Sequence, residues 1–264
     1  MVVSKGLWVY AIGRVDHPQP AQVEAVDGSS HVDVVAGEAL AAFCSRVDLE
    51  DFSQDVIDAR SKDVEWLGAL GYRHQSVMAA LMRGGAIIPL RAFTLFGSDA
   101  AVRTMLHEER ETLARTLERL DGKQEWTLRI EFDPQRWSEA LVRRVDALRE
   151  LAAQIDGAPS GRAFLLRKKL DEEKKRASRE AEQQVVGEIE RAVLDALRCD
   201  TVAESRTQRG GAFPQINVLL DRDEEGRLQE LGETLESRYG PDGVTLAVTG
   251  PWPPYSFAQR AKDE

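Results

Sequence analysis

The second half of the sequence alternates between strand and helix patterns in an order that few folds accept. EWTLRIEF (125–132) alternates strictly between apolar and polar residues, which is typical of a strand with one buried face. Helical spacing follows, then two more strand patterns, a second helix and a last strand, VTLAVTG (244–250). Counted from Glu125, the order is β-α-β-β-α-β. The apolar residues that would share the buried face of the first strand are Trp126, Leu128, Ile130 and Phe132.

An unusually long helical connection separates the first two of these strands. Asp133-Pro134 begins a helix with apolar residues at steps of four and three, and GAPSG (157–161) predicts a turn. A long helix follows to about Leu197. Its centre, DEEKKRASREAEQQ, is almost wholly polar and predicts the exposed tip of an antiparallel helical hairpin. We therefore expect a modified ferredoxin-like (βαββαβ) domain over residues 122–250, with the helical hairpin at about 135–199.

Residues 1–121 predict a separate N-terminal α+β domain, which a chain of 264 residues can accommodate. Strand patterns occur in LWVYAI, HVDVV and ALAAFCSRV, and GGAIIPL predicts a short buried strand. Apolar residues at helical spacing predict a helix between Ser61 and Met82. A second helix is expected from the N-cap residue Ser98 to Asp121-Gly122. The fold class is therefore α+β with two domains.

The C-terminal tail, residues 251–264, begins within an unusual segment, GPWPPYSF (250–257). Its three prolines exclude a central strand or a helix interior, while its three aromatic residues favour burial. The aromatics could clamp the tail onto its own domain, or they could be anchors in an interface with a partner. The candidate residues for either role are Trp252, Tyr255 and Phe257.

Residues with the spacing of known chemical sites were not found in the sequence. The four histidines are scattered, and HExxH, GxSxG and Walker A patterns do not occur. We therefore expect no catalytic residue, no cofactor and no metal. A net charge of −10 argues against nucleic acid as a partner, and no apolar run is long enough to span a membrane. The N-terminus reads as a strand and not as a signal peptide, which favours a cytoplasmic location.

Several long motifs become informative when taken together and in order. They are EWLGALGYRHQSVMAALMRGGAIIPLRAFTLFGSD, GKQEWTLRIEFD, SGRAFLLRKKLDEE, INVLLDRDEEGRLQELGETL and VTLAVTGPWPPYSF. With this series the chain resembles the gas vesicle protein L/F family (GvpL/GvpF) over about residues 6–258. The resemblance implies a non-enzymatic accessory protein of gas vesicle assembly, acting in the cytoplasm and at the gas vesicle. It also implies the hydrophobic shell protein and other accessory proteins as partners, and the two-domain fold described above.

One short segment departs from the family pattern. PLRAFT (89–94) stands where the family usually reads Pro-Leu-Arg-Phe-Gly-Thr, so Ala92 and Phe93 replace a large residue followed by glycine. A turn that glycine would ease must therefore be made by a residue with a side chain.

Two modes of binding the shell protein remain open. A strand of the shell protein could add to an exposed edge of the N-terminal sheet, or an amphipathic helix could dock against the helices of this chain. The N-terminal domain is the preferred platform. Two other functions stay in competition: a scaffold that binds partners through the charged hairpin, and an enzyme on a ferredoxin-like scaffold.

Overall fold

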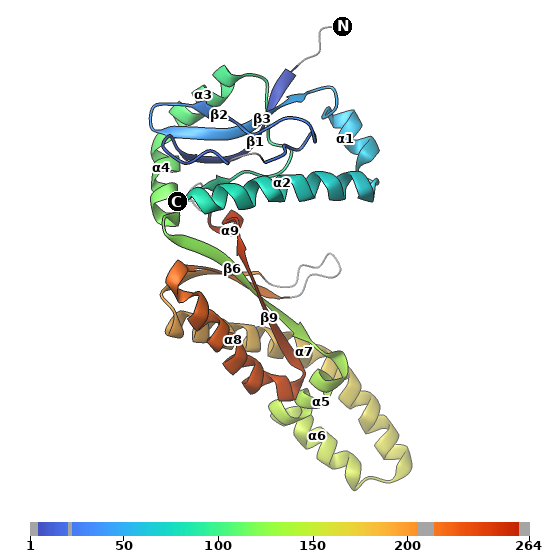
Figure 1. The fold of residues 1–264 in the computed structure, drawn as a ribbon. Helices are drawn as coiled ribbons and strands as arrows, with labels where there is room; N and C mark the ends of the chain where they lie inside the picture. The colour runs from blue at the N-terminus through green and yellow to red at the C-terminus, as the bar shows by residue number, and fades with distance from the viewer. Residues whose placement is uncertain (1–4, 21–22, 205–213, 259–264) are drawn as a thin grey trace. The chain divides into compact units, whose positions relative to one another are not determined.

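The computed structural model describes residues 5–20, 23–204 and 214–258. The chain forms two compact units, one made of Met1–Glu125 with Pro251–Glu264 and the other of Trp126–Gly250. Each unit contains one sheet and several helices (Figure 1), so the prediction of a mixed helix-and-sheet chain is confirmed. The chain therefore leaves the first unit after residue 125 and returns to it at residue 251.

The sheet of the first unit is built around its first strand. β1 pairs antiparallel with β3 from Lys5↔Asp48 to Arg14↔Leu40, with a register shift between Val9 and Ala11. The strand order is β2-β3-β1-β4, and β5 also pairs with β1. The strands are β1 (Lys5–Arg14), β2 (Asp33–Ala36), β3 (Leu40–Asp48), β4 (Ile88–Pro89) and β5 (Leu95–Phe96).

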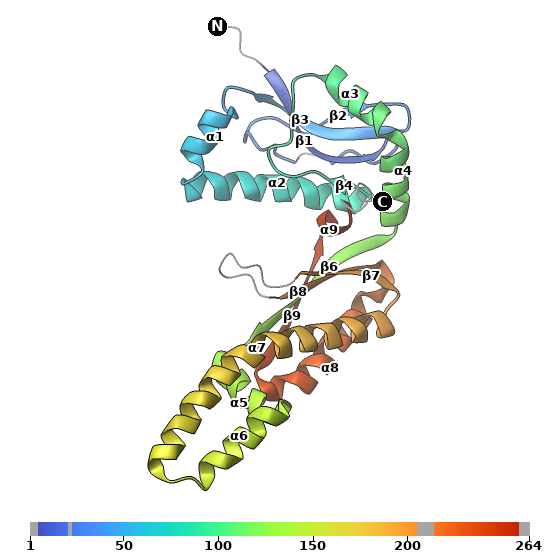
Figure 2. The same ribbon diagram turned by 180° about the vertical axis from the view of Figure 1, so that it is seen from behind.

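Helices cover this sheet because its central strand is apolar on both faces. Residues 6–13 are all buried, so neither face of β1 contacts water. The longest helix of this unit, α2, runs along the sheet (Figures 1 and 2) and packs Val77, Met78 and Leu81 against Trp8 and Tyr10. The helices of the N-terminal segment of this unit are α1 (Gln54–Arg60), α2 (Val64–Gly84), α3 (Asp99–Glu108) and α4 (Arg110–Leu120).

The start of α3 and the end of α4 follow local capping rules, but a break between these two helices was not visible in the sequence. Ser98 accepts a hydrogen bond from the backbone N–H of Ala101 and starts α3, as expected for an N-cap. Gly122 follows α4 with a φ of 71°. The prediction of a single helix between Ser98 and Asp121 is wrong, because the chain divides at Glu109 into two helices, α3 and α4.

The second unit places one face of a four-stranded sheet against helices. The strand order is β7-β8-β6-β9, and the alternating apolar residues of β6 join one core with α5, α7 and α8. Its strands are β6 (Lys123–Phe132), β7 (Cys199–Glu204), β8 (Gln215–Asp221) and β9 (Val244–Trp252). Its helices are α5 (Pro134–Arg144), α6 (Asp146–Asp156), α7 (Ser160–Ala196) and α8 (Glu225–Tyr239), with short 3-10 turns at Arg222–Glu224 and Gly240–Asp242.

The helix expected from Pro134 to Ile155 is interrupted, because Val145 adopts an extended conformation between α5 and α6. The prediction that the polar stretch 171–184 would be the hairpin tip is also wrong. The hairpin instead turns at residues 157–159, between α6 and α7 (Figure 2). The polar stretch lies in mid-helix, where the small side chains of Ala177 and Ala181 form a narrow face against the core.

Candidate functional site

The C-terminal tail packs within the first unit. The last helix, α9 (Tyr255–Ala258), belongs to the same compact unit as β1 and α2. Phe257 is fully buried and Tyr255 half-buried, whereas Trp252 keeps 41% of its surface exposed. Among the three candidate aromatics, the structure therefore buries Phe257 fully, Tyr255 in part and Trp252 least. Residues 259–264 of the predicted tail lie outside the described residues.

Polar contacts fix the backbone of this tail. The Glu125 carboxylate, only 5% exposed, accepts hydrogen bonds from the Ser256 backbone N–H at 3.0 Å and from the Ser256 hydroxyl at 2.7 Å. The Arg119 guanidinium donates to the Phe257 carbonyl. The Glu125 carboxylate thus accepts from the donors of Ser256, and the Arg119 guanidinium supplies a donor to the Phe257 carbonyl. The polar groups of the tail therefore keep hydrogen bonds although the Phe257 ring enters the core.

His74 links the tail to the centre of the sheet. Its Nδ1 accepts a hydrogen bond from Trp8 Nε1 at 3.2 Å, and its Nε2 lies 3.1 Å from the Tyr255 hydroxyl. Because an indole N–H can only donate, Nδ1 must be unprotonated and the ring hydrogen of the neutral imidazole lies on Nε2. His74 Nε2 is therefore the donor to Tyr255.

Burial removes these groups from acid–base chemistry near neutral pH. It lowers the pKa of His74 to about 4 and raises the pKa of Tyr255 to about 12. A general acid or base works best with a pKa near the working pH. The pair is thus suited to holding the tail and not to proton transfer. A single histidine between Tyr72 and Gln75 in a helix gave no sequence signal for this contact.

The turn that departs from the family pattern keeps a backbone conformation that glycine prefers. Phe93 has a φ of 67° and is the one non-glycine residue with positive φ in the part of the chain that the structure describes. Its ring lies 5.0 Å from that of Trp8 and 6.2 Å from that of Trp66, measured between centroids. Phe93 therefore accepts the strain of the left-handed region while adding its ring to the core.

An open groove lies where β2, β3 and α3 meet in the first unit. Its volume is about 330 Å³, and its wall is largely apolar with basic side chains from α3 and the start of α4. Arg103 Nε donates to the Ala36 carbonyl at 3.3 Å and Arg110 bonds to Glu38 at 3.2 Å, so two of these bases are fixed. The residues that line the groove are Ala36, Gly37, Glu38, Ala39, Leu40, Arg103, Leu106, His107 and Arg110.

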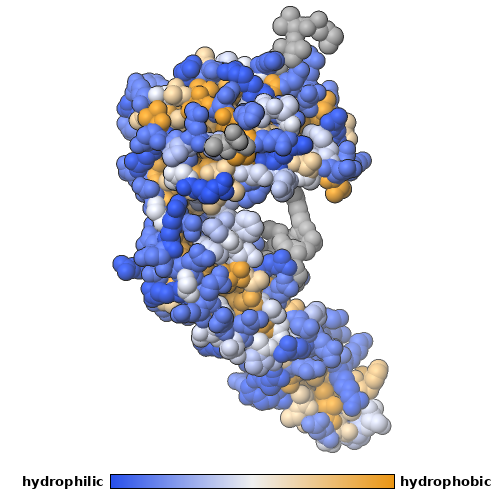
Figure 3. Space-filling view, in the orientation of Figure 1, coloured by the Kyte–Doolittle hydropathy of each residue, from blue (hydrophilic) through white to orange (hydrophobic). Residues whose placement is uncertain are grey.

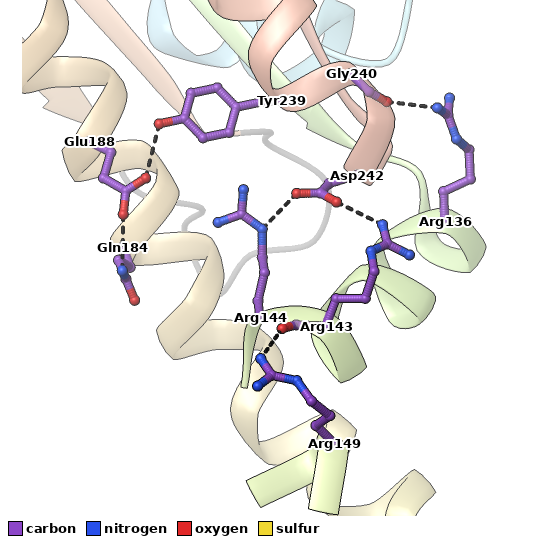
Figure 4. A network of polar contacts seen from close by, with 9 residues as sticks. All are labelled: Arg136, Arg143, Arg144, Arg149, Gln184, Glu188, Tyr239, Gly240 and Asp242. Carbon is purple, nitrogen blue, oxygen red and sulfur yellow. Dashed lines mark hydrogen bonds and ion pairs between the residues drawn. The ribbon is translucent and has the colours of Figure 1, made fainter. Parts of the chain in front are cut away.

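A polar network joins the helices of the second unit (Figure 4). Arg144 donates to Asp242 at 2.8 Å, Arg143 donates to the other oxygen of the same carboxylate at 2.7 Å, and Tyr239 donates to Glu188 at 2.9 Å. Arg144 also lies over the Tyr239 ring, 5.6 Å from its centroid. Partial burial opposes ionisation of Asp242, but the two arginine bonds outweigh it and hold its pKa below the usual value. The network fixes α5 against α7 and the end of α8.

Within the described ranges, no three or more His, Cys, Asp or Glu residues are placed to hold a metal ion. No helix among the described residues has the length and apolar character needed to cross a membrane.

The two units together define a mixed helix-and-sheet fold that is shared with solved gas vesicle proteins. The crystal structure of GvpF from Anabaena sp. PCC7120 matches with a TM-score of 0.67 over 97% of both chains, at 15% identity. GvpF from Microcystis aeruginosa matches with a TM-score of 0.65 over 96% of this chain and 99% of that one, also at 15% identity. At this identity the likeness concerns the fold alone.

The sequence comparisons are more specific. The profile described as gas vesicle synthesis protein GvpL/GvpF matches residues 6–259. Gas vesicle protein L of Streptomyces sp. (strain CB03234) is 30% identical over 97% of this chain and 94% of its own length. Gas vesicle protein F of the same strain is 28% identical over 96% and 99%. The chain belongs to the GvpL/GvpF family of gas vesicle proteins, as the resemblance of its motifs predicted.

Proposed function

We propose that this chain is a non-enzymatic accessory protein of gas vesicle assembly that binds the hydrophobic shell protein through its first unit. The observation that carries the proposal is the groove between β2 and α3. It is apolar along Ala36, Ala39 and Leu40, and its basic rim is fixed by hydrogen bonds. A preformed apolar groove of this kind accepts the apolar face of an amphipathic helix.

The margin of the first sheet supports the same location. β2 is the last strand in the order β2-β3-β1-β4, so the sheet ends beside the groove. It has only four residues, which is typical of an edge strand that does not pair indiscriminately. Both binding modes, helix docking and strand addition, would therefore use the same side of the first unit. Transient cover of an apolar subunit there would prevent its aggregation before it enters the shell.

For the second unit we propose a ferredoxin-like domain that serves other gas vesicle accessory proteins. The order β7-β8-β6-β9, with two helical connections over one face, supports this assignment of residues 122–250. The helical hairpin at about 135–199 is the feature added to that plan. We propose no cofactor, no metal and no catalytic residue, and a location in the cytoplasm and at the gas vesicle.

For the tail we propose a division of roles among its aromatics. Phe257 and Tyr255 act as the clamp, supported by burial of the first and by the bond of the second to His74. Trp252 is the candidate for a contact with a partner, because 41% of its surface remains exposed.

The test is co-purification of the full chain with the shell protein expressed beside it. Ala36→Glu with Ala39→Glu places two carboxylates on exposed positions of the groove without removing a core side chain. We expect shell protein to be lost from this variant and kept by Ala69→Glu, an exposed position on α2 outside the groove. Equal retention by both variants, with folding confirmed by circular dichroism, would overturn the groove as the binding site.

A further inference from the structure

The free end of the helical hairpin carries apolar and basic side chains together. We refer to residues 160–170, at the start of α7, as the hairpin tip. Phe164 and Leu165 are adjacent there and keep 67% and 66% of their surface exposed. The tip contains no acidic residue, although the whole chain has a net charge of −10. Its four bases are Arg162, Arg167, Lys168 and Lys169.

These four bases form no ion pair with the described part of the chain. The ion pairs nearest in sequence are Arg149–Asp146 and Arg176–Glu173, on either side of the tip. Figure 3 shows hydrophobic surface among hydrophilic atoms at this end of the hairpin. The hairpin tip thus combines two exposed apolar side chains with cations that form no ion pair. Such a surface suits a partner that carries both negative charge and apolar side chains.

The first unit of the same chain has a surface with these properties. Residues 48–58, here called the acidic segment, span the end of β3 and most of α1 and contain no base. Val56 and Ile57 within it are half-buried, and Val64, which follows at the start of α2, is 80% exposed. The acidic residues of the segment are Asp48, Glu50, Asp51, Asp55 and Asp58.

We propose that the hairpin tip of one copy of this chain docks on the acidic segment of a second copy. Charge complementarity selects this pairing, because a segment with four bases and no acid meets one with five acids and no base. Phe164 and Leu165 supply the apolar anchor at its centre. Most other encounters between two copies of a chain with net charge −10 are repulsive.

The contact is heterologous, because two different surfaces of the chain meet in it. After one contact, the pair still presents one hairpin tip and one acidic segment, so association either continues to further copies or closes into a ring. A contact between exposed charges is also screened by salt, since the screening length falls from about 30 Å at 0.01 M to about 3 Å at 1 M. Self-association should therefore be strong at low salt and weak at high salt.

The experiment is sedimentation velocity of the full chain over a concentration series at low and high salt. K168E/K169E reverses charge at the hairpin tip, and D51K/D55K reverses it in the acidic segment. Each variant should weaken self-association at low salt about tenfold or more. R179E/R198E is the matched control, since it changes two exposed bases of the second unit away from the tip by the same charge. F164S/L165S tests the apolar anchor at unchanged charge.

Mixing the two reversed variants gives the decisive result. The acidic tip of K168E/K169E is complementary to the basic segment of D51K/D55K, so the mixture should regain the association that each variant has lost. A chain that stays monomeric at every concentration and salt would overturn the proposal. So would equal effects of K168E/K169E and its control, or a mixture that does not recover. Binding of anionic lipid vesicles by the tip without self-association would assign it a different partner and also refute the proposal.

Discussion

His74 should make the first unit less stable as the pH falls. Burial lowers its pKa from 6.5 to about 4, so between these values the unfolded chain holds a proton that the folded chain does not. Stability is therefore complete above about pH 6.5, declines as the pH falls through this window and reaches its lower level below about pH 4. The difference of roughly 2.5 pKa units corresponds to about 3 kcal/mol.

The hydrogen bonds of His74 also predict that the first unit loses stability as the pH falls. Nδ1 accepts from the Trp8 indole, so a proton on Nδ1 would oppose that N–H and break the bond. The bond from Nε2 to Tyr255 would remain, which means that acid should loosen the attachment to Trp8 first. We expect the tail itself to stay bound through Ser256 and Phe257 until the unit unfolds.

His74→Gln isolates the contribution of His74 protonation to the pH dependence of stability from that of all other titrating groups. A glutamine amide can accept from Trp8 and donate to Tyr255 but does not titrate. We expect the free energy of unfolding of the natural chain to fall by about 1.4 kcal/mol per pH unit more steeply than that of the variant between about pH 6 and pH 4.5.

The assay is urea unfolding of dilute protein followed by tryptophan fluorescence, with the transition of the first unit identified by its shift in Phe257→Ala. Direct titration of the His74 ring by NMR supplies a second measurement. Equal slopes in the two proteins, or a titration midpoint near 6.5, would refute the reasoning.

Substitutions at four positions test the packing. Phe257→Ala should lower the free energy of unfolding of the first unit by about 3–5 kcal/mol because its ring is fully buried, whereas Trp252→Ala should lower it by less than about 1.5 kcal/mol. Urea unfolding compares the two variants. A larger loss of stability for Trp252→Ala would contradict the role of Phe257 as the clamp. Phe93 has a positive φ, which glycine adopts more easily than alanine, so Phe93→Gly should be about 1 kcal/mol more stable than Phe93→Ala although both lack the ring. The reverse order of stability in thermal unfolding would exclude a left-handed turn. Arg144→Met should destabilise the second unit by about 1–3 kcal/mol and raise the pKa of Asp242. NMR titration of the Asp242 carboxyl measures this pKa, and an unchanged value would contradict the ion pair with Arg144.

Local patterns in the sequence predicted much of the secondary structure. The alternation in β6 and the N-cap at Ser98 appear in the structure because they depend on neighbours within a few residues. The breaks at Glu109 and Val145 were missed, since apolar residues continue at helical spacing across both positions.

The groove between β2 and α3 could not be predicted, because its walls come from residues 36–40 and 103–110 and no spacing rule relates them. The departure at Phe93 was visible as an unusual residue at a glycine position, but only the structure shows that the left-handed backbone is kept. The sequence placed the exposed end of the helical hairpin on the polar stretch, whereas the chain turns before α7.

The sequence by itself determined the β-α-β-β-α-β pattern of the second half, the family and the aromatic character of the tail, since these depend on residue types and short spacings. Tertiary structure alone decided where the tail binds, which of its aromatics is buried and that His74 is neutral. His74 and Tyr255 are 181 positions apart, and the pKa of each is set by how completely the fold excludes water around it. Exclusion of water depends on all the segments that surround a side chain, and a one-dimensional pattern does not contain that information.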